Sequence, residues 1–166
     1  NILVFGDTDI KLCDFGLAKQ CIYNSGLTHT SNICTLLYRA PEVILNPGKY
    51  TCLIDIWSIG IILLELILGY HPFMEENVTE ENVIHNIFKL LGTPNEHNWK
   101  GVSKLCNWNE FTIYESTLRY LFLDNNISEN EYDLLSKLLS WEPSRITAYE
   151  ALNHPYFKEY KEKNNK

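Results

Sequence analysis

The sequence has few of the features that mark secreted, zinc-binding or nucleic-acid-binding proteins. Its 166 residues include five cysteines, an odd number with wide spacing and no Cys-x-x-Cys motif. This spacing indicates neither a disulfide framework nor a zinc site. Such cysteine usage favours a reducing compartment, so we expect the protein in the cytoplasm, the nucleus or both. The 14 basic and 21 acidic residues give a net charge of -7, which argues against a nucleic-acid partner.

The sequence also lacks an apolar run long enough to span a membrane. Its most apolar stretch is LIDIWSIGIILLELILGYHPF, in which residues 56–70 include Ser58 and Glu65. A bilayer needs about 20 apolar residues, so we predict a helix buried on nearly all sides and no membrane partner. The chain has no signal-peptide pattern, and its first residue is Asn rather than Met. We therefore expect it to be part of a longer protein.

The remaining pattern is mainly helical, with one short β-hairpin near the start. Two apolar runs, ILVF and IKLC, flank a Gly/Asp turn and predict this hairpin. Residues 17–39 show no sustained period and include the polar run YNSGLTHTSN. A structureless stretch of this length is typical of a functional surface loop. Residues 159–166 are charged and polar, and we expect them to form a solvated tail.

Three capping boxes predict the starts of helices in the second half of the chain. A Ser or Thr precedes a Glu by three positions at Thr93, Ser128 and Thr147. In such a box the two side chains satisfy backbone N–H groups that the first helical turn leaves unpaired. Pro94 suits the first position of the first helix, and we expect Pro155 to stop the last one.

Four sequence motifs with chemical meaning follow one another along the chain. They are NILVFGDTDIKLCDFG at residues 1–16, RAPE at 39–42, DIWSIG at 55–60, and EPSRITAYEALNHPYF with its Arg before the last capped helix. In this order they resemble the protein kinase family from the end of its catalytic loop onward. The resemblance covers residues 1–158 and implies a partial kinase domain. The expected fold is mainly α with a short β-hairpin, the C-terminal lobe of a protein-kinase-like fold.

The resemblance implies a nucleotide and metal site at the hairpin. Asn1 and Asp14 match the family's two metal ligands, and Leu3 matches the residue on which the adenine ring rests. Carboxylate and amide oxygens suit Mg²⁺, which neutralises the triphosphate during phosphoryl transfer, so we expect ATP and Mg²⁺ as cofactors. The family's catalytic Asp, in H-R-D-x-x-x-x-N, lies before the matching Asn and is not in this sequence. We therefore expect these residues by themselves to be inactive.

The segment after Asp14 resembles one branch of the family. TLLYRAPEVIL resembles the proline-directed group of cyclin-dependent, mitogen-activated and glycogen synthase kinases, and IFKLLGTPNEHNWKGVSKL resembles the cyclin-dependent branch. The resemblance places the activation segment at residues 14–42 and its phosphorylated threonine at Thr30. It also implies protein substrates with Ser/Thr-Pro sites, and a cyclin bound through a lobe that this sequence does not contain.

Further residues match substrate-site positions of the same family. Thr35 matches a threonine that contacts the catalytic Asp and Lys. Cys34, Leu37 and Arg39 match the pocket that receives the proline after the phosphorylated residue. Leu37 stands where Trp is usual in this group, so the floor of the pocket can differ in shape.

Three charged residues match structural positions rather than catalytic ones. Glu42 and Arg145 match a buried ion pair that connects the end of the activation segment to the last helices. Asp55 matches a residue that accepts backbone hydrogen bonds from the catalytic loop. Removing one member of a buried ion pair costs about 3–5 kcal/mol of stability, because the other charge stays buried without compensation.

The sequence leaves alternatives open at two levels. The whole lobe could be a non-catalytic pseudokinase or docking module, although the intact Asn1 and Asp14 favour a kinase because a docking module needs no metal ligands. Within the kinases, the alternative is a proline-directed kinase outside the cyclin-dependent branch. Thr30 could also be an ordinary solvated loop residue.

Overall fold

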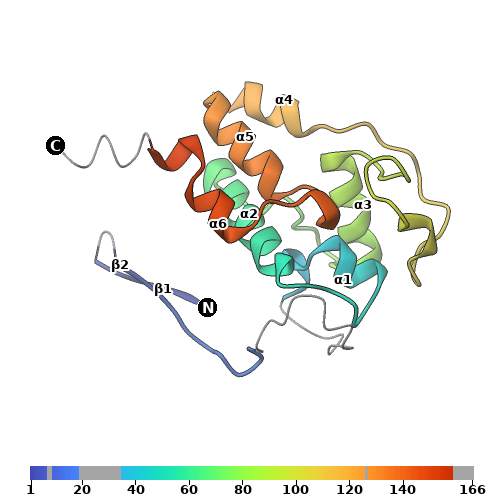
Figure 1. The fold of residues 1–166 in the computed structure, drawn as a ribbon, viewed down its shortest axis with the longest axis horizontal. Coiled ribbons are helices and arrows are strands. Elements are labelled where there is room, and N and C mark those ends of the chain that lie inside the picture. The colour runs from blue at the N-terminus through green and yellow to red at the C-terminus, as the bar shows by residue number, and fades with distance from the viewer. Residues whose placement is uncertain (7–8, 19–34, 126, 159–166) are drawn as a thin grey trace.

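The computed structural model shows a body of packed helices and a β-hairpin set apart from it (Figure 1). The structure describes residues 1–6, 9–18, 35–125 and 127–158. We call its described residues from 35 onward the helical body. The labelled helices are α1 (Pro41–Leu45), α2 (Leu53–Leu68), α3 (Glu80–Leu91), α4 (Leu118–Asp124), α5 (Glu129–Leu138) and α6 (Ala148–Leu152), and residues 155–158 are helical as well. Short 3-10 turns occupy η1 (Leu36–Tyr38), η2 (Val102–Lys104) and η3 (Glu142–Ser144). Within the described residues, no helix is both long and apolar enough to cross a bilayer.

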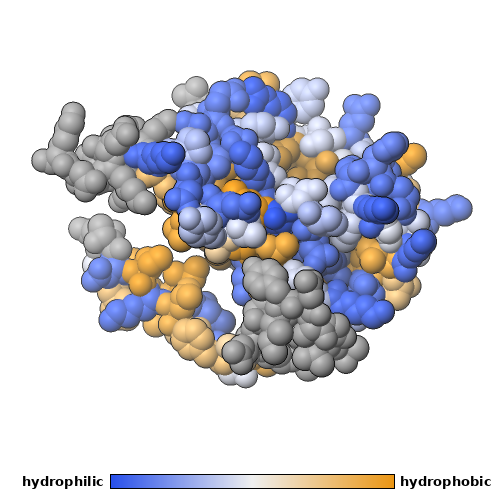
Figure 2. Space-filling view, viewed as in Figure 1, coloured by the Kyte–Doolittle hydropathy of each residue, from blue (hydrophilic) through white to orange (hydrophobic). Residues whose placement is uncertain are grey.

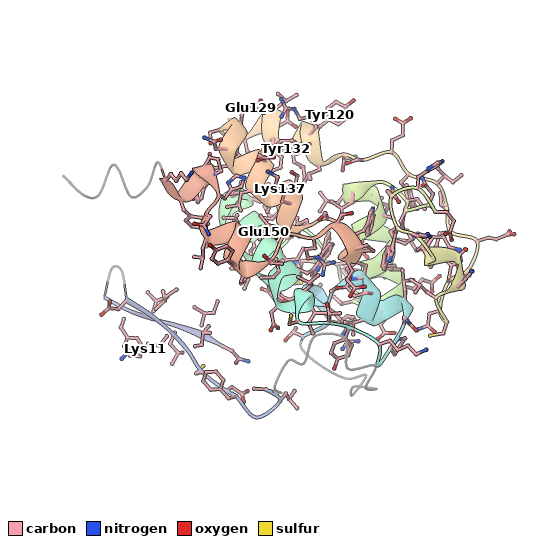
Figure 3. All side chains as sticks on the ribbon, viewed as in Figure 1. Lys11, Tyr120, Glu129, Tyr132, Lys137 and Glu150 are labelled. Atoms are coloured by element: carbon pink, nitrogen blue, oxygen red, sulfur yellow. The ribbon has the colours of Figure 1, made fainter. Side chains whose placement is uncertain are left out.

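The hairpin consists of β1 (Ile2–Phe5) and β2 (Asp9–Leu12), which confirms its prediction from the two apolar runs. The strands are antiparallel, with Ile2 opposite Leu12 and Phe5 opposite Asp9. All residues of both strands are exposed, and Figure 2 shows the hairpin as a largely orange, hydrophobic element. In Figure 3 its Lys11 lies apart from the labelled residues of α5 and α6. An isolated two-stranded hairpin is only marginally stable in water, so this element contributes little stability of its own.

The core of the helical body forms around α2. Trp57, Ile61 and Leu64 of this helix are fully buried, and α2 packs against α5. The two helices approach closely at Gly60, where an added Cβ would lie 2.7 Å from the Leu139 Cδ2 atom. Because Cβ atoms do not approach other atoms this closely, only glycine fits at this position without a shift of the Leu139 side chain.

The prediction that α2 is buried on nearly all sides is wrong, although the helix itself is confirmed. Leu66 is 76% exposed and Ile59 is 51% exposed, on the side away from the core residues Trp57 and Leu64. An exposed stripe formed by Asp55, Ile59 and Leu66 therefore remains on α2. A continuous apolar run therefore predicts a helix, but it does not say which elements cover its second face.

Two of the three predicted capping boxes are confirmed. Ser128 Oγ accepts a hydrogen bond from the Glu131 backbone N–H, and the Glu131 side chain accepts one from the Ser128 backbone N–H. Thr147 caps α6 by the same reciprocal pair with its third helical residue. The helix α6 ends at Leu152 with Asn153 as its C-cap, so it ends before Pro155, which is the first of the helical residues 155–158.

The capping box predicted at Thr93 is wrong. The Thr93 hydroxyl donates a hydrogen bond to the Thr112 carbonyl oxygen at 2.7 Å and accepts one from the Tyr114 N–H at 2.9 Å. The Glu96 carboxylate instead accepts bonds from the Gly101 N–H and from the N–H and hydroxyl of Ser103. Both side chains therefore stabilise connections between segments, and no helix starts here.

Aromatic side chains fill the space between α3 and the C-terminal helices. The rings of Trp99 and Trp141 are stacked, with centroids 5.3 Å apart. Phe88 of α3 makes edge-on contacts with Trp141 and with Phe111. Because aromatic pairs add about 0.5–1.5 kcal/mol beyond the burial of their surface, this cluster fixes the positions of segments that have little regular structure.

Candidate active site

The open end of the hairpin pairs Asn1 with Cys13, the residue before Asp14. The Cys13 backbone N–H donates a hydrogen bond to the Asn1 carbonyl oxygen at 2.9 Å, which extends the pairing of β1 and β2 by one step. Asp14 follows Cys13 directly. The two residues that match the family's metal ligands are therefore neighbours across the hairpin, although thirteen positions separate them in sequence.

Asp14 has an unusual backbone conformation. Its φ angle is +60°, and among the described residues it is the only non-glycine with a positive φ. Asp tolerates this left-handed region better than most residues do, and such conformations cluster at functional sites. The Gly16 backbone N–H donates a hydrogen bond to Asp14 Oδ1 at 3.3 Å. The carboxylate of this exposed residue is thus oriented by its own turn.

Asn1 and Asp14 suit a Mg²⁺ ion whose remaining ligands are nucleotide phosphates and water. Mg²⁺ is usually held by one or two protein oxygens, with phosphates and water completing six ligands. Asn1 and Asp14 provide an amide and a carboxylate, both exposed. The described residues contain no group of three or more His, Cys, Asp or Glu side chains that could enclose a metal. The donor set therefore suits an open site.

Leu3 lies on the same hairpin, opposite Lys11 in the strand register. Its side chain is 47% exposed, and the neighbouring Val4 and Phe5 are also exposed. Leu3, which matches the adenine-binding position, therefore lies on the same hairpin as Asn1 and Asp14, which match the metal ligands. An apolar side chain left open in this way can rest against an aromatic base.

The segment from Thr35 to Tyr38 is anchored to α2 by two hydrogen bonds. Ser58 Oγ donates to the Tyr38 carbonyl oxygen at 3.0 Å, and the Tyr38 hydroxyl donates to Glu65 Oε2 at 2.8 Å. Burial and the nearby Glu65 carboxylate raise the pKa of Tyr38 to about 12, so its hydroxyl stays protonated and remains a donor. Thr35, at the start of this segment, is exposed.

The predicted substrate-pocket residues lie on and after η1. Leu37 is buried in the core of the helical body, and the Arg39 side chain is only 10% exposed. Arg39 Nη1 donates to Glu80 Oε1 at 2.5 Å, and Glu80 is the first residue of α3. Cys34 and Thr30, the remaining predicted residues of the activation segment, lie outside the described residues.

Glu42 and Arg145 form the buried ion pair that the resemblance to the kinase family implied. Arg145 Nη1 and Nη2 donate to the two Glu42 carboxylate oxygens at 2.5 and 2.9 Å, and both side chains are almost completely buried. Arg145 also donates to the carbonyl oxygens of Leu53 and Ser140. This pair joins the start of α1 to the turn before α6, 103 residues later. Its full set of hydrogen bonds compensates for the removal of both charges from water.

Asp55 lies in the first turn of α2, where a carboxylate interacts favourably with the helix dipole. The residue is exposed overall, yet the partial burial of its carboxyl raises its pKa. Its position leaves the carboxylate accessible to another segment.

The sequence analysis did not identify two carboxylates that bind the segment containing Tyr38 and Arg39. Glu65 binds Tyr38 from 27 positions away, and Glu80 binds Arg39 from 41 positions away. Neither belongs to one of the four motifs. Because both partners are distant in sequence, only the packing of η1 against α2 and α3 reveals these contacts.

Comparison with known proteins identifies the family and several relatives of the chain. The protein kinase domain family matches residues 1–157. Cyclin-dependent kinase B2-1 of Arabidopsis thaliana is 42% identical over 156 residues, which is 93% of this chain and 48% of that protein. Its counterpart from Oryza sativa subsp. japonica is 42% identical over 150 residues, covering 89% of this chain and 44% of that protein.

A relative from another lineage gives the same result. Cyclin-dependent kinase 7 of Dictyostelium discoideum is 42% identical over 160 residues, which is 95% of this chain and 43% of that protein. The chain thus spans less than half the length of each of these relatives. The chain belongs to the protein kinase family, and within that family it is similar to the cyclin-dependent kinases.

Proposed function

We propose that the longer protein containing this chain transfers the γ-phosphoryl group of ATP to Ser or Thr followed by Pro on protein substrates. The observation that carries this proposal is the placement of Asn1 beside Asp14 at the end of the hairpin. A docking module has no use for two exposed residues with oxygen ligands at the paired ends of a hairpin. The named relatives are cyclin-dependent kinases, which supports a cyclin as the activating partner.

In this proposal the chain supplies the metal-binding half of the active site. Asp14 and Asn1 would hold Mg²⁺, which when bound offsets the negative charge that develops during phosphoryl transfer. The bond from the Gly16 N–H restrains the Asp14 carboxylate within its own turn. Leu3 would support the adenine ring on the same hairpin, so one element orients both ends of the nucleotide.

The other half of the proposed site orients the protein substrate. In this proposal Thr35, which is exposed, would contact the catalytic groups that the longer protein supplies. Leu37 and Arg39 follow it on a segment fixed to α2 and α3. Phosphorylation of Thr30 would add nearly two negative charges to the activation segment and order it by pairing with basic side chains.

The proposal is tested by Asp14→Asn in the full-length protein, purified with its cyclin and assayed on a Ser-Pro peptide. Loss of the carboxylate removes a metal ligand, so we expect turnover to fall below detection while the melting temperature stays unchanged. Asp9→Asn is the matched control, because Asp9 is an exposed carboxylate on β2 of the same hairpin. Equal turnover of Asp14→Asn and wild type would contradict the proposal. A wild-type protein without any turnover would favour the pseudokinase alternative.

A further inference from the structure

The ion pair between Arg39 and Glu80 differs in exposure at its two ends. The Arg39 side chain is 10% exposed, whereas that of Glu80 is 51% exposed, and Arg39 Nη1 lies 2.5 Å from Glu80 Oε1. A guanidinium so deeply buried is unfavourable unless a carboxylate or other acceptors compensate for its lost hydration. Glu80 supplies a carboxylate from the solvent side.

The position of Glu80 is itself fixed by the start of α3. Thr79 caps this helix by accepting a hydrogen bond from the Asn82 N–H at 3.1 Å. The Asn82 side chain donates to the Asn77 carbonyl oxygen at 2.8 Å. Glu80 is the first helical residue, where a carboxylate also interacts favourably with the positive end of the helix dipole. The helix start therefore fixes the backbone position of Glu80 independently of its contact with Arg39.

The segment that carries Arg39 has other anchors, and they act on different atoms. Ser58 holds the Tyr38 main chain, Glu65 holds the Tyr38 ring hydroxyl, and Arg145 holds Glu42 at the start of α1. These contacts position the backbone on both sides of Arg39. The side-chain direction of Arg39 is set in part by Glu80, which lies on a separate helix.

We propose that Glu80 is a positioning residue for substrate selection, because it orients the Arg39 guanidinium that shapes the pocket for the residue after the phosphorylated Ser or Thr. This inference rests on the proposed function, since it assigns Arg39 to that pocket. In this role the first residue of α3 contributes to the selectivity for proline. A neutral side chain at position 80 leaves the guanidinium without this carboxylate, and Arg39 turns toward other acceptors.

The test compares Glu80→Gln with Glu81→Gln in the full-length protein bound to its cyclin. Both substitutions remove one negative charge from the first turn of α3, but Glu81 is exposed and is not the residue that binds Arg39. Two peptides that differ only in Pro or Ala after the target Ser serve as substrates. The measurements are kcat and KM for each peptide, KM for ATP, and peptide affinity by fluorescence anisotropy.

For Glu80→Gln we expect the ratio of kcat/KM between the Pro and Ala peptides to fall about tenfold, the size of one lost charged hydrogen bond. The loss should appear mainly in KM for the Pro peptide, with KM for ATP unchanged, because the metal site lies on the hairpin. Glu81→Gln should keep the wild-type ratio, and Glu80→Asp should recover part of it. Combining Glu80→Gln with Arg39→Gln should add little to the effect of Arg39→Gln alone.

The outcomes separate this inference from the proposed function. An active wild type whose proline selectivity survives Glu80→Gln would overturn the role of Glu80 and leave the kinase proposal standing. A wild type without turnover that still binds the Pro peptide selectively, and loses that selectivity in Glu80→Gln, would support Glu80 while the kinase proposal fails. Absence of both turnover and selective binding in the wild type would overturn both.

Discussion

In the hairpin, apolar side chains such as Val4 and Leu12 are more than 60% exposed, whereas Ile61 and Ile87 of the helical body are completely buried. Both regions contain apolar runs, such as ILVF in the hairpin and IGIILLELIL in α2. They differ in what surrounds them, since the helices cover one another and the hairpin stands apart (Figure 1). The difference in burial means that stability resides in the helical body.

The same comparison separates stability from chemistry. The hairpin is flanked by Asn1 and Asp14, and none of its described residues belongs to the buried core. The helical body carries the core and the anchored segment with Arg39. An apolar two-stranded hairpin requires cover to be stable in water, and we expect other parts of the longer protein to provide it. Substitutions should therefore affect the two regions very differently.

The largest difference in stability is expected from Arg145→Met in the helical body. This change leaves the Glu42 carboxylate buried without its partner and should lower the free energy of unfolding by about 3–5 kcal/mol, measured by urea denaturation. Arg119→Met is the control, because Arg119 pairs with Glu129 at an exposed position and its loss should change little.

A second variant tests the cause of that loss. If an unpaired buried charge is responsible, the double variant Glu42→Leu with Arg145→Met should be more stable than Arg145→Met alone. A double variant as unstable as Arg145→Met would show that packing around the arginine, and not charge, dominates.

Truncation of one apolar side chain in each region tests the comparison directly. Ile87→Ala removes buried methyl groups from α3 and should cost about 2–5 kcal/mol of unfolding free energy in the 166-residue chain. Val4→Ala in the same chain should change it by no more than about 0.5 kcal/mol, because Val4 is exposed on β1. Similar losses for both variants would mean that the hairpin shares the core of the helical body.

A smaller effect is expected at the closest approach of α2 and α5. Gly60→Ala places a methyl group against Leu139 and should destabilise the helical body by about 1–3 kcal/mol, seen as a lower midpoint of thermal unfolding. Leu66→Ala, on the exposed side of the same helix, is the matched control and should shift the midpoint less. A larger shift for Leu66→Ala than for Gly60→Ala would mean that the packed face of α2 has been assigned incorrectly.

The smallest effect is expected for Glu96→Gln, and it depends on pH. Hydrogen bonds from Ser103 and Gly101 lower the pKa of the Glu96 carboxyl from 4.5 to about 2 in the folded chain. A lowered folded pKa stabilises the protein above the unfolded pKa, and this contribution disappears as pH falls toward 2. The difference in unfolding midpoint between wild type and Glu96→Gln should therefore be constant near pH 7 and shrink below pH 4.5. A difference that grows in acid would contradict the assigned bonds.

What could be predicted from sequence depended on how local the interactions are. The capping boxes at Ser128 and Thr147 are complete within four residues, and both occur in the structure. The same pattern failed at Thr93, because its hydroxyl binds Thr112 and Tyr114 of a distant segment. A local pattern competes with tertiary hydrogen bonds that the sequence does not show.

The candidate site followed the same division. The neighbouring positions of Asn1 and Asp14 follow from the hairpin, because strand pairing places the two ends side by side. The buried pair of Glu42 and Arg145 came from resemblance to a family, since no local pattern connects residues 103 positions apart. Neither a local pattern nor the family resemblance predicted the contact between Arg39 and Glu80. It depends on the packing of α3 against η1.

The aromatic cluster has a consequence for spectroscopy. All four tryptophans of the chain, at positions 57, 99, 108 and 141, belong to the helical body, and the indoles of Trp99 and Trp141 are stacked. The indole signals in fluorescence and near-ultraviolet circular dichroism therefore report on the helical body, because residues 1–16, which include the hairpin, Asn1 and Asp14, contain no tryptophan. Phe5→Trp would add an emitter to β1 and make detachment or docking of the hairpin visible in its own right.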